Sequence, residues 1–294
     1  MTNILAIGIA TLDIINTVES YPNEDSEQRA VSQHQTRGGN ATNTLTVLSQ
    51  LDHHCAWGGV IIDEPDSQII QRDLDNNHID LTGCKRLANG KMSTSYITLN
   101  QQTGSRTIVH HRDCPEFSFE DFNKIDLKQF DWVHFEGRNI AETRFMLLHV
   151  KKYYPDLPCS LEIEKPRPDI ELLFDLPTVL LFSQQYALAR GFKDASSLLS
   201  SLNSNITATC TWGHDGAWAV NQRINIFHSP AFPPTQVIDT LGAGDTFNAG
   251  LIHYLVSNTP LDLALTGACQ LAGHKCGQQG FAQLFHTFKP TVYV

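Results

Sequence analysis

Short apolar, β-branched runs alternate with helix-periodic runs along most of this 294-residue chain. Strands separated by helices are typical of a mostly parallel sheet covered on both faces, which predicts an α/β fold. In such folds ligands bind beyond the carboxyl ends of the strands. The predicted strands are Ile4–Ile9, Trp132–Glu136, Ser160–Ile163, Thr178–Phe182 and Ala208–Trp212, and the predicted helices are Asn40–Leu51, Ser67–Asn76, Ala141–Tyr154, Asp194–Leu202, Asp245–Ser257 and Leu261–Cys276.

Two stretches, 14–36 and 93–112, interrupt this alternation. The first has no helical period, and the second alternates as a strand, turns at Gln101–Gly104 and returns, as a hairpin does. We predict that these two stretches form a small β-sheet lid; two ordinary surface hairpins are the alternative. The core then consists of residues 1–13, 37–92 and 113–294, in which His286–Val294 carries little pattern and is predicted to be a loosely held tail.

Charge and cysteine usage narrow the function classes. The net charge of -10 argues against a nucleic-acid or anionic-membrane surface, so neither partner is expected. No apolar run approaches the roughly 20 residues that a membrane span needs, and the N-terminus lacks the basic start of an export signal. Seven dispersed cysteines without a C-x-x-C pair suit reduced thiols. A cytoplasmic enzyme is expected.

The segment 239–250, Asp-Thr-Leu-Gly-Ala-Gly-Asp-Thr-Phe-Asn-Ala-Gly, leads directly into a predicted helix. Free backbone N–H groups and the dipole at a helix N-terminus favour a bound phosphate. Small residues at Gly242, Ala243 and Gly244 let a phosphate approach the main chain. Asp245 would then accept the proton of a substrate hydroxyl during phosphoryl transfer. The alternative is an acid that only complements the helix dipole, and the adjoining glycines favour the base.

A second segment, Arg37-Gly-Gly-Asn-Ala-Thr-Asn43, also precedes a helix. Asn40 and Asn43 lie three residues apart, hence on one helix face, and their amides can bind sugar hydroxyls. Asp13, expected at the end of the first strand, adds an acceptor for a polyol. The alternatives are that Asn40 caps the helix with Asn43 merely exposed, and that Asp13 belongs to a turn.

Both segments resemble the signature motifs of the ribokinase/PfkB family of carbohydrate kinases. Within that family, the sequence from Ile4 to about Phe281 is most similar to the ketohexokinase (hepatic-type fructokinase) group. The narrower likeness rests on blocks that the wider family does not share, namely Tyr21–Glu27, Gly104–Ile108, Glu136–Asn139, Glu162–Arg167 and Lys275–Phe281.

The resemblance implies a ribokinase-like fold, with a mostly parallel central sheet flanked by helices and a small β-sheet lid. It implies ATP as co-substrate, Mg²⁺ as metal and a homodimer in which two lids clasp, and it leaves a monovalent-cation requirement open. By motif, Asp245 is the base and the N–H groups of Gly242, Ala243 and Gly244 form the anion hole. The sugar would be held by Asp13, Gly39, Asn40 and Asn43, and Arg138 would contact the sugar or the transferred phosphate. Asp25 would reach the sugar of a partner subunit.

On the nucleotide side, the resemblance places Arg106 at the ATP phosphates and Trp212, His214, Gly216 and Cys269 along the nucleotide pocket. Without the resemblance, Arg106 and Arg138 read as solvated surface residues, and Thr211–Gly216 reads as a strand end followed by a polar turn.

The chain departs from the ketohexokinase pattern at two positions. Gln184 stands where these kinases commonly carry a lysine, and His214 stands where they carry an acid. Both changes bear on nucleotide contacts and not on the phosphoryl chemistry. The Asn-x-x-Glu metal motif of the wider family is missing from Ser183–Ala187, so Glu162 and Glu164 are the candidate Mg²⁺ ligands.

The leading hypothesis is an ATP-dependent ketohexose kinase that converts fructose and ATP to fructose 1-phosphate and ADP. A kinase for a different small sugar, polyol or nucleoside is the alternative within the family. A non-catalytic sugar or nucleotide sensor is disfavoured by Asp245, since a pure binder gains nothing from a base. A dehydrogenase would need Gly-x-Gly-x-x-Gly after the first strand, and Gly8–Asp13 does not supply it.

Overall fold

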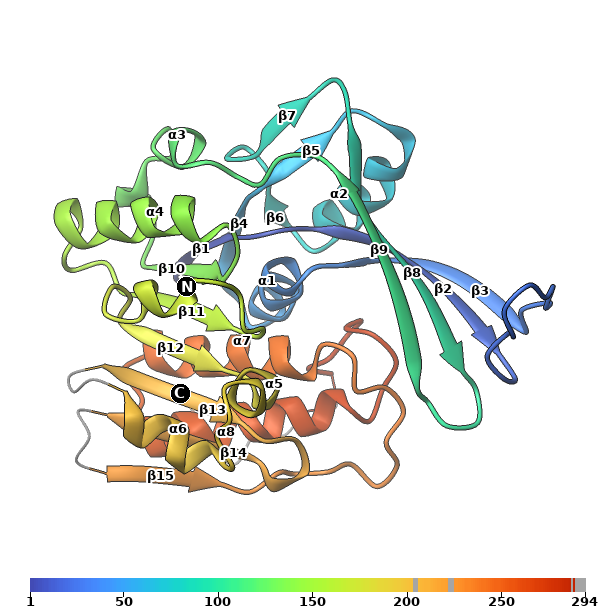
Figure 1. The fold of residues 1–294 in the computed structure, drawn as a ribbon. Helices are drawn as coiled ribbons and strands as arrows, with labels where there is room; N and C mark the ends of the chain where they lie inside the picture. The colour runs from blue at the N-terminus through green and yellow to red at the C-terminus, as the bar shows by residue number, and fades with distance from the viewer. Residues whose placement is uncertain (203–205, 222–224, 287, 289–294) are drawn as a thin grey trace.

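The computed structural model describes residues 1–202, 206–221, 225–286 and 288 (Figure 1). Its centre is a nine-stranded sheet in the order β15-β14-β13-β12-β11-β10-β1-β4-β6, parallel except for the pairs β13–β14 and β14–β15 at one edge. Its strands are β1 Asn3–Ile7, β4 His54–Gly58, β6 Ile79–Asp80, β10 Trp132–Glu136, β11 Cys159–Ile163, β12 Val179–Phe182, β13 Thr207–Thr211, β14 Ala217–Asn221 and β15 Asn225–Ser229. The predicted α/β class with a mostly parallel sheet is confirmed.

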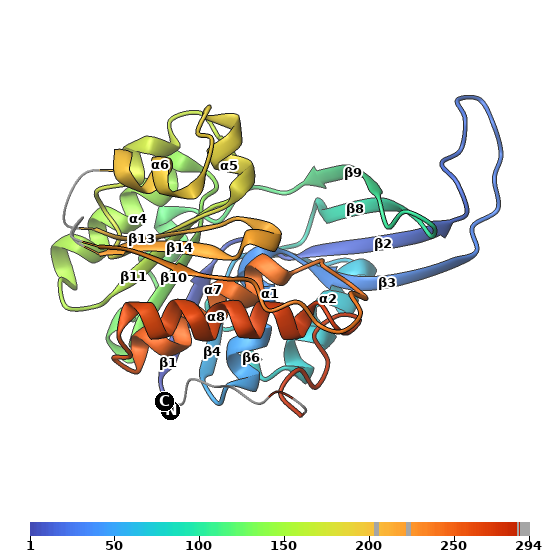
Figure 2. The same cartoon turned by 90° about the horizontal axis from the view of Figure 1, so that it is seen from below.

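Helices cover both faces of this sheet. Figure 2 shows α4, α5 and α6 on one face and α7 and α8 on the other. The helices are α1 Asn40–Gln50, α2 Pro65–Asn76, α3 Phe119–Phe122, α4 Ile140–Tyr153, α5 Gln184–Ala189, α6 Ala195–Ser201, α7 Ala243–Val256 and α8 Leu261–Lys275, with short 3-10 turns at Leu127–Gln129, Ile170–Leu173 and Gly213–Asp215. Within the described residues, no helix is long and apolar enough to cross a membrane.

The six predicted helices and five predicted strands all appear, with ends shifted by one or two residues. Within the central sheet, the sequence patterns missed β4, β6 and the antiparallel strands β14 and β15, and they also missed the short helices α3 and α5. β6, with two residues, and α5, with six, are too short for a period to stand out. The predicted tail from His286 falls largely outside the described residues.

A separate four-stranded sheet, in the order β3-β2-β8-β9, projects from the core (Figures 1 and 2). Its strands are β2 Thr11–Val18, β3 Ser32–Gly38, β8 Lys91–Asn100 and β9 Arg106–Asp113; a further pair, β5 Val60–Ile62 and β7 Lys85–Leu87, lies beside it in the core. Each strand of the four-stranded sheet reaches slightly closer to the core than the predicted lid bounds of 14–36 and 93–112.

One local placement is wrong. Asp13 does not end the first strand, because β1 stops at Ile7 and Asp13 lies inside β2. The chain passes from the central sheet to the projecting sheet within residues 8–10. The apolar run that begins at Ile4 therefore contains two strands, one in each sheet. Asp13 therefore lies at the root of the projecting sheet, where that sheet joins the core.

Candidate active site

Glycine shapes the N-terminus of α7. Gly242 precedes the helix with a φ of +76°, and a Cβ on it would lie 2.2 Å from the ring of Phe281. Only glycine fits such a tight left-handed turn without strain. A Cβ on Gly244 would meet nothing within 4 Å, so the first turn is open on that side. The N–H of Ala243 donates to the Thr240 carbonyl at 3.3 Å, a long contact. An anion can thus approach the first turn of α7.

Asp245 is the third residue of α7, and its side chain is buried. The amide Nδ2 of Asn43 donates to its Oδ2 at 2.7 Å. Burial is the main cause that raises the pKa of Asp245 to about 7. The Asn43 hydrogen bond lowers this pKa, and the charges of Glu164 and Glu136 raise it. A carboxylate with a pKa near neutrality is well matched to accept a proton at physiological pH.

Asn40 is the first residue of α1 and faces two carboxylates. Its Nδ2 lies 3.2 Å from Glu162 Oε1 and 3.2 Å from Glu164 Oε2, and Asn248 of α7 donates to the same Glu162 oxygen at 3.1 Å. The capping reading of Asn40 is wrong, because Gly39 is the N-cap and no side chain caps the helix. The companion idea that Asn43 is merely exposed is also wrong, since Asn43 is buried. The amide of Asn40 in α1 and the carboxylates at the carboxyl end of β11 therefore share one site.

The environment of Glu162 suits a carboxylate that binds a metal cation. Burial, followed by the charges of Asp245 and Glu136, raises its pKa well above the usual range. Its Oε2 is buried without a hydrogen-bond partner. Carboxylate oxygens suit Mg²⁺, which takes only one or two of them beside water and phosphate oxygens. Among the described residues no group of three or more His, Cys, Asp and Glu side chains could hold a metal alone. The site fits a cation completed by phosphate and water.

Asp13 lies in β2, beside the glycine pair that precedes α1. Its Oδ1 accepts from the Thr11 hydroxyl at 2.9 Å, and burial raises its pKa. A Cβ on Gly38 would lie 2.2 Å from Asp13 Oδ2, so glycine is required there for β3 to pass. Gly39 has a φ of +109°, and a Cβ on it would lie 2.2 Å from the Ile9 carbonyl. Both glycines are thus needed to bring Asp13 close to the start of α1.

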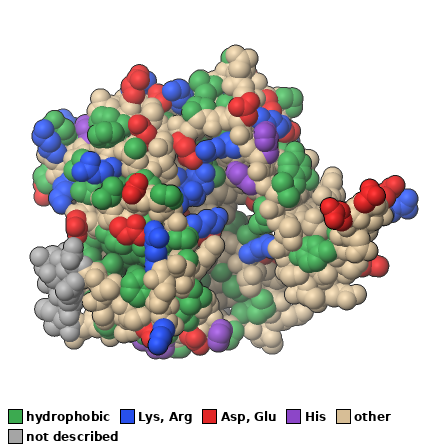
Figure 3. Space-filling view, in the orientation of Figure 1, with side chains coloured by type: hydrophobic (Ala, Val, Ile, Leu, Met, Phe, Trp, Pro, Cys, Tyr) green, Lys and Arg blue, Asp and Glu red, His purple; other side chains and the backbone are tan. Residues whose placement is uncertain are grey.

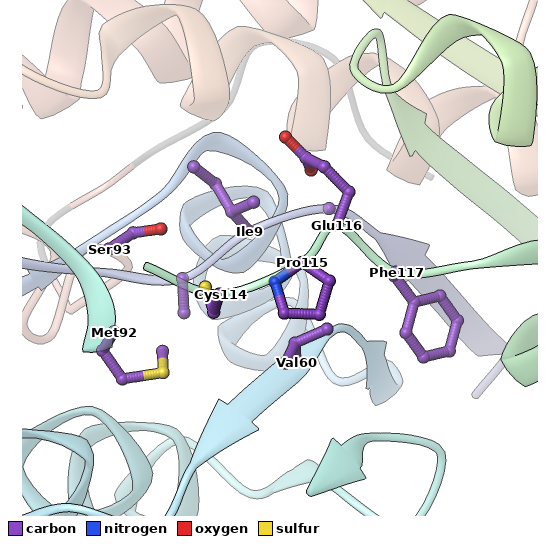
Figure 4. A pocket seen from close by; sticks show the side chains of 10 residues that line it. Ile9, Val60, Met92, Ser93, Cys114, Pro115, Glu116 and Phe117 are labelled. Atoms are coloured by element: carbon purple, nitrogen blue, oxygen red, sulfur yellow. The ribbon is translucent and has the colours of Figure 1, made fainter. Parts of the chain in front are cut away.

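Arg138 is anchored by acidic neighbours. Its Nη2 lies 3.0 Å from Glu116 Oε1 and its Nη1 lies 3.5 Å from Glu136 Oε1. Figure 4 shows a small pocket lined by Glu116, in which Val60 and Met92 lie opposite the Glu116 carboxylate. The predicted surface reading of Arg138 is wrong, because its side chain is only 16% exposed. On the surface, Lys and Arg side chains gather around the cleft between the core and the projecting sheet (Figure 3).

Two predicted residues do not join this cluster within one chain. Asp25 lies in the exposed connection between β2 and β3, at the far end of the projecting sheet (Figure 2). Arg106 begins β9 beside the exposed β8–β9 turn. Both assignments stay predictions, since they depend on a partner subunit or on a bound nucleotide.

The predicted nucleotide residues meet at the end of β13. Trp212 is buried and precedes the 3-10 turn Gly213–Asp215, whose His214 side chain is 92% exposed and lies 3.2 Å from Asp215. A Cβ on Gly213 would lie 3.6 Å from Gln184 Oε1, so the two positions that depart from the ketohexokinase pattern share one neighbourhood. The other two residues predicted to line the nucleotide pocket are Gly216, which has a φ of +89°, and Cys269, which is buried in α8. The strand-end reading describes this segment correctly, and a nucleotide role stays a prediction.

Comparison with known proteins agrees with this geometry. The profile of the pfkB family of carbohydrate kinases matches residues 1–287. The chain belongs to that family. It is 39% identical to the ketohexokinase of Mus musculus over 289 residues, which cover 95% of this chain and 97% of that protein. It is 21% identical to an ATP-dependent ribose-1-phosphate kinase of Halopiger xanaduensis, covering 95% and 94% of the two chains.

The fold is also that of known family members. The ribokinase of Giardia lamblia superposes with a TM-score of 0.84 at 16% identity, covering 97% of both chains. The protein is therefore an ATP-dependent carbohydrate kinase with a ribokinase-like fold, and a sugar and ATP are its small-molecule partners.

Sequence reasoning missed several members of this pfkB site. Glu136 and Asn248 were not singled out as site residues, although both lie inside quoted motifs. Arg37 begins the Gly-Gly-Asn segment, and its burial gives it contacts that a surface arginine would lack. An arginine directly before a glycine pair was the signal that the sequence offered for Arg37. Glu136 offered only its place at the end of a predicted strand.

Proposed function

We propose that the protein is a ketohexokinase that transfers the γ-phosphate of ATP to the 1-hydroxyl of fructose. The observation that carries the proposal is Asp245, a buried carboxylate with a raised pKa at the open N-terminus of α7. The 39% identity to a ketohexokinase over nearly the whole chain supports the choice of sugar. Another small sugar, polyol or nucleoside is the alternative substrate, and a non-catalytic sensor is the alternative outside the class.

The proposed reaction uses groups that lie together in the site. Asp13, Asn40 and Asn43 orient the sugar, and the Asp245 carboxylate accepts the proton of its hydroxyl. The sugar oxygen bonds to the γ-phosphorus while the bond from phosphorus to the ADP oxygen breaks. Negative charge that develops on the phosphoryl oxygens is stabilised by the N–H groups of Gly242–Gly244.

Mg²⁺ would neutralise charge on the ATP phosphates when bound. Glu162 and Glu164 are the residues of this chain that would hold it, directly or through water. The buried, unpartnered Oε2 of Glu162 supports this assignment.

A substrate panel tests the proposed function. ADP release should depend on fructose, with a higher kcat/KM than for aldoses or nucleosides, because the polar side chains of the site must match the hydroxyls of one sugar. Release that depends on another sugar and not on fructose would replace the substrate but keep the kinase. Absence of release with every member of the panel would favour the sensor.

We also propose a homodimer through the projecting sheet. Tyr96 on β8 and Val109 on β9 are cross-strand neighbours, and they are 46% and 65% exposed. Apolar side chains gathered on one sheet face are commonly covered by a partner. In such a dimer, Asp25 would contact the sugar bound in the partner subunit. The seven free cysteines agree with a cytoplasmic location, which we include in the proposal.

Sedimentation velocity tests the dimer. Val109→Lys should convert a dimer of the wild-type chain into a monomer, because a lysine charge would have to be buried in the interface. Leu172→Lys is the matched control, since Leu172 is 62% exposed in a 3-10 turn of the core, away from the sheet. A monomeric wild type, or a Val109→Lys variant that remains a dimer, would refute this interface.

A further inference from the structure

We propose that Arg37 is a positioning residue for phosphoryl transfer, because it fixes the Asn43 amide that holds Asp245. This inference rests on the proposed role of Asp245 as the base. Arg37 is buried, and the proposed reaction assigns it no contact with the phosphate or the sugar.

The guanidinium of Arg37 is enclosed by partners. Its Nη1 donates to Asn43 Oδ1 at 2.7 Å and to the Thr42 hydroxyl at 2.9 Å, and its Nη2 donates to the Thr46 hydroxyl at 2.8 Å. The Nε pairs with Asp73 on α2. The Arg37 side chain is only 2% exposed. Because its donors are engaged on every side, the planar guanidinium is held in one orientation. It therefore also holds the side-chain oxygen of Asn43 in one position.

This contact sets the polarity of the Asn43 amide. A guanidinium can only donate, so the amide oxygen must face Arg37. The amide nitrogen must then face Asp245, to which it donates at 2.7 Å. If the amide were turned over, two donors would meet at Arg37, and two acceptors would meet at Asp245. Arg37 therefore orients the Asn43 amide so that its nitrogen donates a hydrogen bond to Asp245.

The same arrangement controls the charge at the base. The charges of Glu136 in β10, Glu162 in β11 and Glu164 just after β11 act on Asp245, and the neutral amide of Asn43 from α1 contacts it. The acidic neighbours favour its protonated form. Arg37, from the root of β3, acts in the opposite direction. Because protonated Asp245 cannot accept a proton, Arg37 and Asn43 extend the pH range in which the base works.

The test compares two substitutions in the full chain, with fructose, or the sugar that the panel selects, and ATP. Asn43→Asp keeps the shape and still accepts from Arg37, but it presents a negative oxygen to Asp245 instead of a donor. We expect the acid limb of the pH profile of kcat/KM to move up by about one unit or more. Turnover should fall about tenfold or more at pH 6.5 and recover towards pH 9, because raising the pH restores ionised Asp245.

Arg37→Lys keeps the charge and loses the fork, so a lysine cannot hold Asn43, Thr42 and Thr46 in one geometry. We expect kcat to fall about tenfold at pH 6.5 and the acid limb to move up, because a loosened Asn43 amide no longer lowers the pKa of Asp245 as strongly. Arg86→Lys is the matched control, because Arg86 is exposed and contacts Gln71 away from the site. A purely structural role of Arg37 would lower stability without moving the acid limb, so an Arg37→Lys variant with the wild-type pH profile would overturn the inference. Asn43→Asp tests the contact between the amide and the base even if Arg37→Lys does not fold.

The same substitutions are then made in an Asp245→Asn background. If Arg37 acts through the base, Arg37→Lys should have little further effect on the residual activity. Equal losses in both backgrounds, or an Asn43→Asp profile that matches the wild type, would overturn the inference. The proposed function fails separately, if Asp245→Asn alone keeps near-normal turnover.

Discussion

Replacing Asp245 by asparagine is expected to lower kcat about 10²–10⁴-fold, which is the usual contribution of a general base. An asparagine keeps the size of the side chain, but its amide cannot take the proton of a sugar hydroxyl. The loss should appear in kcat, because the nucleotide and the sugar are held by other groups. The wild-type kcat/KM should rise with pH through about 7, where burial places the pKa of this carboxyl, and the rise should disappear in the variant.

The matched control separates a base from an acid that only complements a helix dipole. Asp262 occupies the first turn of α8 as Asp245 occupies the first turn of α7, but it is exposed. Asp262→Asn should change stability by less than about 1 kcal/mol and leave kcat unchanged. Binding of ATP is measured by calorimetry in both variants and should stay near the wild-type affinity. Similar turnover in the two variants would refute the assignment of Asp245.

Replacing Lys275 by methionine is expected to cost about 3–5 kcal/mol of unfolding free energy, the range for breaking a buried ion pair. Lys275 is fully buried, and its Nζ donates to Asp239 Oδ2 at 2.8 Å and to the Asp239 carbonyl at 2.9 Å. Asp239 Oδ1 accepts from the Leu241 N–H at 2.9 Å, and its Oδ2 accepts from the Gly280 N–H at 3.1 Å. Methionine would leave the Asp239 carboxylate largely buried without its cation.

The position of this pair links its loss to activity. Burial alone would raise the pKa of Asp239, but Lys275 and the two N–H groups hold it below its usual value. The ammonium joins the loop before α7 to the C-terminal end of α8, and it lies 5.5 Å from the ring of Phe281, which packs against Gly242. The Lys275→Met variant that still folds should therefore lose kcat as well, because the turn that forms the proposed anion hole is released.

Urea unfolding followed by circular dichroism measures the stability change. Lys124→Met is the control, because the Lys124 side chain is 63% exposed in surface ion pairs and its loss should change stability little. The double variant Lys275→Met with Asp239→Asn should recover part of the loss, since it removes the uncompensated charge. A Lys275→Met variant as stable as Lys124→Met would contradict the structural role of the pair.

The outcome at Asn43 shows where sequence reasoning stopped. Its spacing from Asn40 correctly indicated a shared helix face and a polar site. Spacing could not show that its oxygen meets Arg37 and its nitrogen meets Asp245, a residue 202 positions away. The placement of Asp13 failed for a related reason, since a continuous apolar run does not show where a chain leaves one sheet and enters another.

The sequence by itself determined the alternation of strands and helices, the glycine turn before α7 and the residue types of the site. These features are local, because helical period, β-branching and the conformational freedom of glycine act over a few neighbouring residues. Only the tertiary structure decided which charges surround Asp245. The parallel order β11-β10-β1 brings Glu162, Glu136 and the start of α1 together. Burial and strand order depend on the whole packed core, so the raised pKa of Asp245 is a property of the fold and not of its motif.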